Sequence, residues 1–192
     1  MKRLLLIIAL LLSGWAVRAQ EGDLAARLEA ANAFRTLSVH FTMTRRSALL
    51  AQPVHSSGVL LIAAPDRLRW EVREPRPQLF IRNGNAIRTP EGKVLSLDTA
   101  PGLSRIPEIT DKLFDGQSFT MTFEATSQGW KIRLVPRRRD LRKLFSELYV
   151  YTEDLLIQAV EWFDPAGDST LLEFSDRTVD ATLQPACFDV GA

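Results

Sequence analysis

The side chains that could perform acid–base or nucleophilic chemistry are few and widely spaced in this chain. Its 192 residues include two histidines, His40 and His55, and a single cysteine, Cys187. A hydrolytic enzyme needs a nucleophile within hydrogen-bonding distance of its base, and no GxSxG-type sequence surrounds any serine here. A hydrolase that pairs His40 or His55 with a Ser or with Cys187 is therefore kept as an alternative function, and no catalytic residue is assigned.

Candidate metal ligands are equally sparse. Two histidines and one cysteine at these separations do not form a zinc site. Asp164 and Asp168 flank a Pro-Ala-Gly turn, where aspartates usually serve the turn itself. Cys187 has no neighbouring cation that would stabilise its thiolate, so we predict a small buried side chain. We predict a protein that is not an enzyme and that uses no metal and no cofactor.

The first nineteen residues have the pattern of a cleaved signal peptide. Lys2 and Arg3 are followed by the apolar run Leu4–Leu12, and residues 17–19 supply the small residues that a signal peptidase reads. The apolar run is too short to span a bilayer comfortably as a helix. We therefore predict that residues 1–19 are a signal peptide and that the chain is secreted or periplasmic.

Residues 20–192 are predicted to form a single domain of mildly acidic charge. The full chain has 24 basic and 23 acidic residues, and the signal peptide removes three basic ones, which leaves 21 against 23. This balance does not favour a nucleic-acid partner. The basic run Arg137–Lys143 is expected to be a solvated loop between strands, with contact to an acidic membrane or partner surface as the alternative.

Hydrophobic periodicity predicts one helix followed by many strands. Asp23–Leu37 has apolar residues at helical spacing, whereas from Ser38 onwards apolar and polar residues alternate. Asn83-Gly84 is a strong two-residue hairpin turn. A second, short helix is predicted at Glu108–Asp115. The predicted strands begin at Ser38 and continue at Val59–Ile62, Arg67–Val72, Leu79–Arg82, Ala86–Arg88, Val94–Leu97, Phe119–Phe123, Trp130–Leu134, Leu144–Thr152, Leu155–Phe163 and Ser169–Phe174.

About ten short strands joined by tight turns predict a meandering antiparallel sheet. One or two helices cannot cover a sheet of that length, so we predict a mainly β fold with some α, an incomplete antiparallel β-barrel. Its N-terminal helix and a lid helix would close the mouth.

Large apolar side chains on these strands would be core in a sandwich, but in a curled sheet some of them would line a cavity, and both interpretations stay open. Their candidate cavity residues are Leu68, Trp70, Val72, Phe80, Phe119, Met121, Phe123, Ile132 and Leu134, and the candidate lid residues are Ile109, Leu113 and Phe114.

Several sequence elements, taken in order, resemble a known family. They are FTMTRR, SSGVLLIAAPDRLRWEVREP, QLFIRNGNAI, LVP and WFDPAGDSTLLEFSD, within residues 22 to 176. This order is similar to that of the LolA-type outer-membrane lipoprotein carrier proteins.

The resemblance implies a periplasmic carrier that shelters the acyl chains of a lipoprotein, or of a related lipid, in an apolar cavity for transfer to the outer membrane. Its implied partners are an inner-membrane release complex and an outer-membrane receptor, and we expect a monomer. No cysteine stands at the predicted mature N-terminus, which separates the chain from the lipid-anchored receptor of that system. A regulatory module that binds a protein partner on the same fold is a further alternative.

The chain departs from the family pattern at three places. The Arg that precedes the Pro of the strand turn, thought to latch the lid, is Ala64 here. The segment between Val94 and Phe119 matches poorly, as do the last dozen residues with Cys187. The resemblance therefore does not carry over the identity of the cargo or the lid latch.

Overall fold

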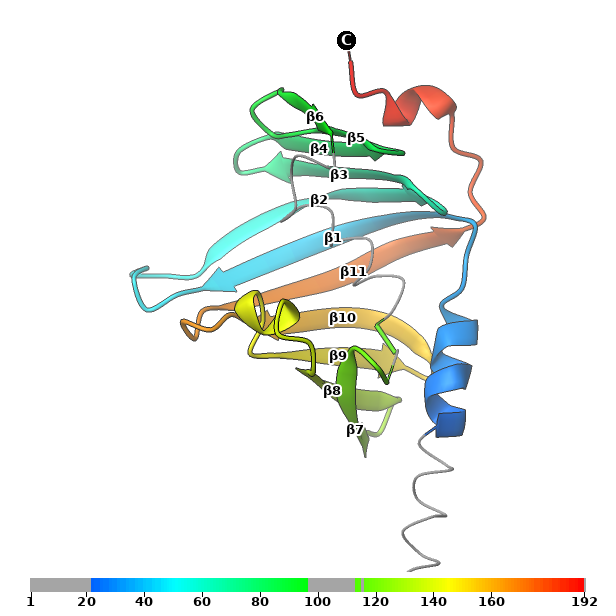
Figure 1. The fold of residues 1–192 in the computed structure, drawn as a ribbon, viewed down its shortest axis with the longest axis vertical. Coiled ribbons are helices and arrows are strands. Elements are labelled where there is room, and N and C mark those ends of the chain that lie inside the picture. The colour runs from blue at the N-terminus through cyan, green and yellow to red at the C-terminus, as the bar shows by residue number, and fades with distance from the viewer. Residues whose placement is uncertain (1–21, 97–112, 115, 192) are drawn as a thin grey trace, which may run out of the picture.

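The computed structural model describes residues 22–96, 113–114 and 116–191. Eleven antiparallel strands form one sheet in the order β6-β5-β4-β3-β2-β1-β11-β10-β9-β8-β7. In Figure 1, β1 and β11 cross the middle of the sheet and the two edges lie at opposite ends of the view. The strands are β1 (Thr36–Arg46), β2 (Val54–Ala63), β3 (Arg67–Glu74), β4 (Gln78–Asn83), β5 (Ala86–Arg88), β6 (Val94–Ser96), β7 (Phe119–Ala125), β8 (Trp130–Pro136), β9 (Glu147–Glu153), β10 (Leu156–Phe163) and β11 (Ser169–Val179).

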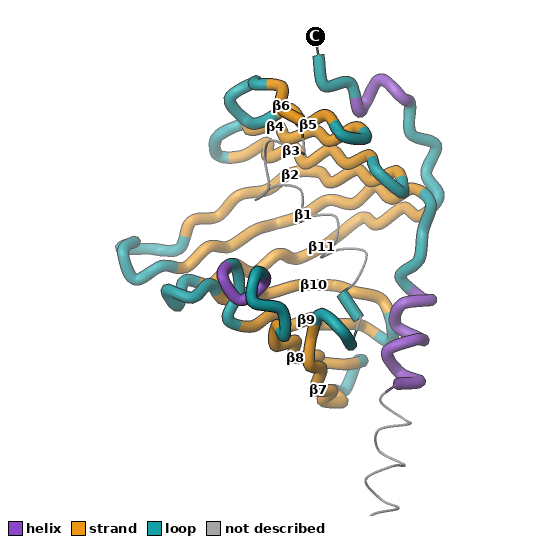
Figure 2. The backbone as a smooth tube through the Cα atoms, viewed as in Figure 1, coloured by secondary structure: helices purple, strands orange, loops and turns teal. Residues whose placement is uncertain are grey.

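The predicted fold class is confirmed. The sheet is open, because β6 and β7 stand at its two ends and pair with only one neighbour each among the described residues. Hairpins join all consecutive strands except β6–β7, and β11 returns to pair with β1, which links the two halves of the sheet. Helical segments are few among the described residues, and Figure 2 shows them beside the strands of the sheet.

The N-terminal helix is shorter than predicted. Residues 22–31 are helical, and β1 begins already at Thr36, so the predicted extension to Leu37 is wrong. Asn32 ends the helix by donating its side-chain amide to the carbonyl of Leu28, at 2.8 Å. Leu37 then starts the two-residue alternation of β1, with Val39 and Phe41 buried on the same face.

The predicted strands are all present with shifted bounds. The strand predicted from Leu144 begins only at Glu147, because Leu144 ends the 3-10 helix that precedes it. β2 begins at Val54 rather than Val59 because it pairs with β1 as far as Arg45. β11 runs to Val179 because it pairs with β1 as far as Leu37. The predicted turn at Asn83-Gly84 shifts by one residue, since Asn83 pairs with Ala86 and the loop residues are Gly84 and Asn85.

Alternation gives the sheet an apolar face and a mixed face. We call the inner face the one that carries Phe41, Trp70 and Leu134, and the outer face the opposite one. Two large clusters of buried residues lie on the inner face, and the N-terminal helix contributes Leu24 and Leu28 to one of them.

The C-terminal segment packs on the outer face of β2–β4, a contact that the sequence patterns did not predict. Its short 3-10 helix η3 (Pro185–Phe188) inserts Phe188 against Ala63 and Ile81, and all three are almost fully buried. Arg69 donates from Nη1 to the carbonyl of Cys187 at 3.2 Å.

Candidate functional site

The inner face is apolar across most of the sheet. The first cluster (the β1–β3 cluster) contains Leu37, Val39, Phe41, Leu60, Leu68, Val72 and Leu172. The second (the β7–β9 cluster) contains Phe119, Ile132, Leu134, Leu141, Leu148 and Val150 together with helix residues and Phe114. Trp162 of β10 packs against both clusters, so they form one continuous apolar surface.

Four of the candidate cavity residues belong to the β1–β3 cluster. Leu68 and Val72 are buried, whereas Trp70 and Phe80 are only half-buried and pack against the cluster. Trp70 and Phe80 face each other in the β3–β4 register, and the Trp70 ring lies 4.4 Å from the Phe41 ring, centroid to centroid. This half therefore has aromatic surface that its own packing does not fully cover.

The other five candidates belong to the β7–β9 cluster. Phe119, Ile132 and Leu134 are at most 1% exposed, since the N-terminal helix packs on them, while Met121 and Phe123 are half-buried. A pocket of about 270 Å³ lies beside β7, and its lining includes Phe119, Met121 and Phe123. In this half the core and the candidate site share the same strands.

Two of the three candidate lid residues can be placed. Leu113 and Phe114 form a turn and pack against the β7–β9 cluster, with Phe114 8% exposed. Ile109 and most of the predicted helix Glu108–Asp115 lie outside the described residues, as does the predicted signal peptide.

The set of candidates omitted several inner-face side chains. These half-buried residues come from the central strands β1, β2, β10 and β11, where large apolar residues fall on the alternation of strands already predicted. They are Met43, Ile62, Val160, Trp162 and Phe174.

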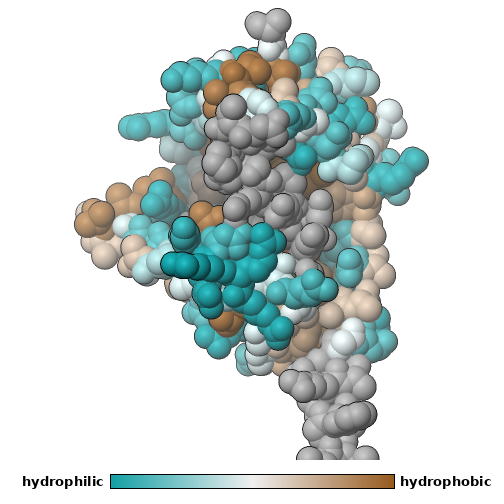
Figure 3. Space-filling view, viewed as in Figure 1, coloured by the Kyte–Doolittle hydropathy of each residue, from teal (hydrophilic) through white to brown (hydrophobic). Residues whose placement is uncertain are grey.

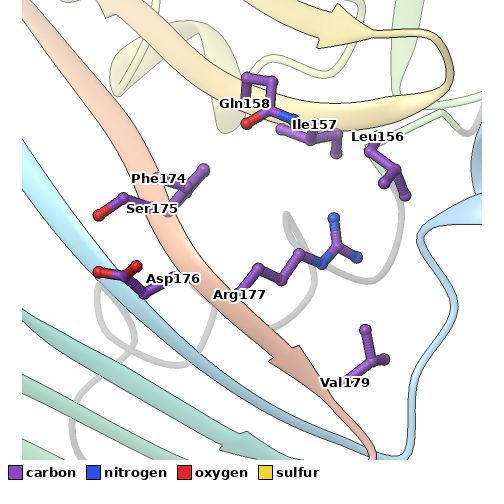
Figure 4. A pocket seen from close by; sticks show the side chains of 8 residues that line it. All are labelled: Leu156, Ile157, Gln158, Phe174, Ser175, Asp176, Arg177 and Val179. Atoms are coloured by element: carbon purple, nitrogen blue, oxygen red, sulfur yellow. The ribbon is translucent and has the colours of Figure 1, made fainter.

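A gap opens in the sheet between β10 and β11. Their pairing stops at Ala159 and Glu173, beyond which the two strands separate. The gap forms a pocket of about 240 Å³, lined by Leu156, Ile157, Gln158, Phe174, Ser175, Asp176, Arg177 and Val179 (Figure 4).

Two register shifts border this gap. β10 shifts against β9 between Ile157 and Ala159, and β11 shifts against β1 opposite the stretch Ser38–His40. At the second shift Asp176 has φ +50°, a left-handed conformation that Asp tolerates better than most residues. The extra residue of a bulge changes which side chains point to each face, and here Arg177 and Val179 lie on the side of Val39 and Leu37.

The polar groups in the gap centre on Arg177 and Asn32. Asn32 donates to the Leu155 carbonyl at 2.8 Å, and its Oδ1 accepts from the Ile157 amide and from Arg177 Nη1, each at 3.1 Å. The Arg177 Nε is buried and has no hydrogen-bond partner in the part of the chain that the structure describes. Burial lowers the pKa of the Arg177 guanidinium below its usual value.

The outer face is polar in the β8–β11 region, where side chains of neighbouring strands interact in pairs. Arg133 donates to Glu147 at 2.7 Å, and Lys131 lies 4.9 Å from the centre of the Tyr149 ring. Burial, together with the hydrogen bond to Glu161, raises the pKa of Tyr151 to about 12. The phenol therefore stays protonated and serves as a hydrogen-bond donor.

The residues considered for catalysis are not brought together. His40 lies 3.4 Å from Asp176 on the exposed outer surface, and His55 hydrogen-bonds Thr44 at 3.0 Å. Cys187 is half-buried in the outer-face segment around Phe188. Within the described residues, neither histidine hydrogen-bonds a Ser or Cys, and no group of three His, Cys, Asp or Glu side chains could hold a metal ion.

The basic run is partly anchored. Leu141, in the 3-10 helix η2 (Leu141–Lys143), is 4% exposed in the β7–β9 cluster. Arg137 donates to the Thr120 hydroxyl at 3.0 Å, and Arg138 pairs with Asp140 at 2.7 Å. No helix in the described ranges has the length and apolarity needed to cross a membrane.

The fold is shared with a solved structure, MucB. MucB superposes with a TM-score of 0.55 at 13% identity, over 91% of this chain and 64% of that one. A LolA superfamily protein from Nitrosomonas europaea superposes with a TM-score of 0.48 at 11% identity, over 88% and 96%.

Sequence comparison identifies the family. An outer-membrane lipoprotein carrier protein of Dechloromonas aromatica is 27% identical over 161 residues, which cover 80% of this chain and 76% of that protein. The corresponding protein of Chromobacterium violaceum is 26% identical, over 96% and 90% of the two chains. The family model described as outer membrane lipoprotein carrier protein LolA matches residues 32–190. Because this match spans most of the chain, the protein belongs to the LolA family of outer membrane lipoprotein carrier proteins.

Proposed function

We propose that this protein binds the acyl chains of a lipoprotein on its inner face and carries them through the periplasm to the outer membrane. The observation that carries the proposal is the continuous apolar inner face on which Met43, Trp70, Trp162 and Phe174 stay partly exposed. A domain that needed these side chains only for stability would bury them more completely.

Acyl chains need such a surface to cross an aqueous compartment. Each CH₂ group that leaves water contributes about 0.8 kcal/mol, so a whole acyl chain is held or released by many small contributions. Aromatic and Met side chains repack around flexible ligands. An open sheet supplies this surface without any reacting group, which suits binding followed by release.

The β1–β2 hairpin supports the delivery step. Leu49 at its tip is 94% exposed and Leu50 is 41% exposed, with Arg46 exposed beside them. The tip projects from the body at the left of Figure 1, where Figure 3 shows apolar residues. An exposed apolar tip next to a cation is favourable at the surface of an acidic membrane, where the apolar side chains leave water and the cation lies near anionic lipids.

Trp70→Glu tests the proposed site. A carboxylate on the half-buried inner face would have to be desolvated when an acyl chain binds, so we expect the affinity for an acylated peptide to fall about tenfold or more. The measurement is fluorescence titration with the acylated peptide and an apolar dye, after circular dichroism has shown that the variant is folded.

Thr122→Glu is the matched control, because Thr122 is exposed on the outer face of β7 and pairs with Arg133 in the ladder. This variant should bind like the wild type. Unchanged affinity in folded Trp70→Glu would remove Trp70 from the site.

A further inference from the structure

The gap between β10 and β11 differs from the rest of the inner face because it contains a cation. Figure 4 shows the Arg177 side chain reaching from β11 across the opening, with apolar side chains of both strands around it. The apolar lining comes from Leu156, Ile157, Phe174 and Val179.

The hydrogen bonds of Arg177 leave part of its donor capacity unused. Its one hydrogen bond to a described residue goes to Asn32, an amide without charge, and no carboxylate among the described residues pairs with it. The Asp176 carboxylate, its chain neighbour, pairs with His40 and is 76% exposed. Nε is buried and has no acceptor within residues 22–96, 113–114 and 116–191.

A partly buried guanidinium without an anion is costly, and the lowered pKa of Arg177 reflects that burial. Asn32 cannot compensate it, because its oxygen already accepts two hydrogen bonds and its nitrogen donates two. A carboxylate or phosphate placed in the gap would supply both the missing charge and the missing acceptor.

The position of the gap indicates that such an anion would be part of a larger amphiphile. Ile157 packs against the β7–β9 cluster and Phe174 against the β1–β3 cluster, so the gap opens at the junction of the two apolar surfaces. A volume of about 240 Å³ is below that of a typical pocket for a whole small-molecule ligand. It fits the head of an amphiphile whose tail lies outside the gap.

We propose that the β10–β11 gap is a subsite for the anionic head group, carboxylate or phosphate, of an amphiphile whose acyl tail lies along the inner face. Arg177 binds the head group through Nε and its free guanidinium N–H groups. Phe174 and Ile157 contact the first part of the tail. This inference rests on the proposed function for the tail, but the head-group contact is its own claim.

The test compares four probes by calorimetric titration at mildly alkaline pH. Dodecanoate and dodecyl phosphate carry head group and tail, dodecanol carries the tail alone, and inorganic phosphate carries the charge alone. We expect both anionic amphiphiles to bind about tenfold or more tightly than dodecanol, with a preference that falls as salt rises. Inorganic phosphate should bind far more weakly than dodecyl phosphate.

Arg177→Gln should remove this preference and leave dodecanol binding unchanged, whereas Arg177→Lys should retain part of it because the charge stays. Arg82→Gln is the matched control. Arg82 also lies on the inner face, opposite Leu68, but its Nε already donates to the Gly84 carbonyl at 3.1 Å. This control should bind all four probes like the wild type.

Three outcomes would overturn the inference. Equal binding of dodecanoate, dodecyl phosphate and dodecanol by the wild type would exclude the head-group contact while leaving the acyl-binding proposal intact. An equal loss of all probes in Arg177→Gln would show that the side chain only maintains the fold. If none of the four probes binds, dodecanol included, both the subsite and the proposed function are overturned.

Discussion

The packing of the inner face requires a glycine at position 58. Gly58 lies in β2 opposite Phe41 and Val72, and the Phe41 ring occupies the space that a side chain would need. A Cβ at this position would overlap the carbonyl oxygen of Glu71 and lie 2.8 Å from the Phe41 ring. The close approach of the strands and the Phe41–Trp70 contact thus require glycine here.

Gly58→Ala is therefore expected to lower the free energy of unfolding by about 2 kcal/mol, the usual cost of overpacking. Urea denaturation measures the change. Gly116→Ala is the control, since the nearest atom to a Cβ there is a flexible Met121 methyl group at 3.8 Å. Equal stability of the two variants would contradict the packing described for Gly58.

Single residues also show which side-chain orientations the sequence predicts and which it does not. The alternation in β3 correctly placed Leu68, Trp70 and Val72 on one face. The same rule applied to β11 would give Asp176 the face that Arg177 occupies, because a bulge adds a residue that no periodicity reveals. The cationic gap was for this reason absent from the predicted site.

Among the elements, the C-terminal segment has a packing role that the sequence patterns did not predict. The motifs read from the sequence ended at residue 176, yet the family match extends to residue 190, and η3 packs Phe188 against Ala63 of β2 and Ile81 of β4 on the outer face. Arg67 lies over the Phe188 ring at 5.6 Å, and Arg69 binds the Cys187 carbonyl. Alternation places both arginines on the polar face of β3 but does not reveal this partner, because contacts between distant segments leave no local pattern.

Phe188→Ala should lower the free energy of unfolding by about 3 kcal/mol, since the ring is 1% exposed and its loss leaves a cavity. Acyl binding in the folded fraction should stay unchanged, because the segment lies on the face opposite the site. Thermal denaturation and dye titration of one sample measure both.

Leu49→Ala provides the comparison for this variant, as Leu49 is 94% exposed and its truncation should change stability by less than about 0.5 kcal/mol. A loss of acyl affinity in folded Phe188→Ala would show that the outer-face segment contributes to the site.

At the scale of the whole molecule, the sheet has two halves with different packing. The N-terminal helix covers the β7–β9 half, whose central residues Ile132 and Leu134 are fully buried. The β1–β3 half keeps half-buried aromatic side chains such as Trp70 and Phe80. The open sheet was predictable from strand number and helix number, but the division between core and candidate site needed the burial of each side chain.

On the proposed function, we expect cargo to contact mainly the β1–β3 half and the central strands, while fully buried residues such as Ile132 and Leu134 maintain the fold. Trp162 connects the two halves, since it packs against both clusters. An open sheet with a permanent core on one side can admit an acyl chain on the other without unfolding.

Site-specific photocrosslinking in cells tests the central claim most directly. A photoreactive phenylalanine analogue at Phe80 on the inner face is compared with the same analogue at Thr122 on the outer face. Mass spectrometry of the adducts identifies what is attached and whether it is acylated. We predict acylated lipoprotein adducts at Phe80 and none at Thr122. Equal adducts at both positions, or adducts at Phe80 that contain only unacylated protein, would contradict the account.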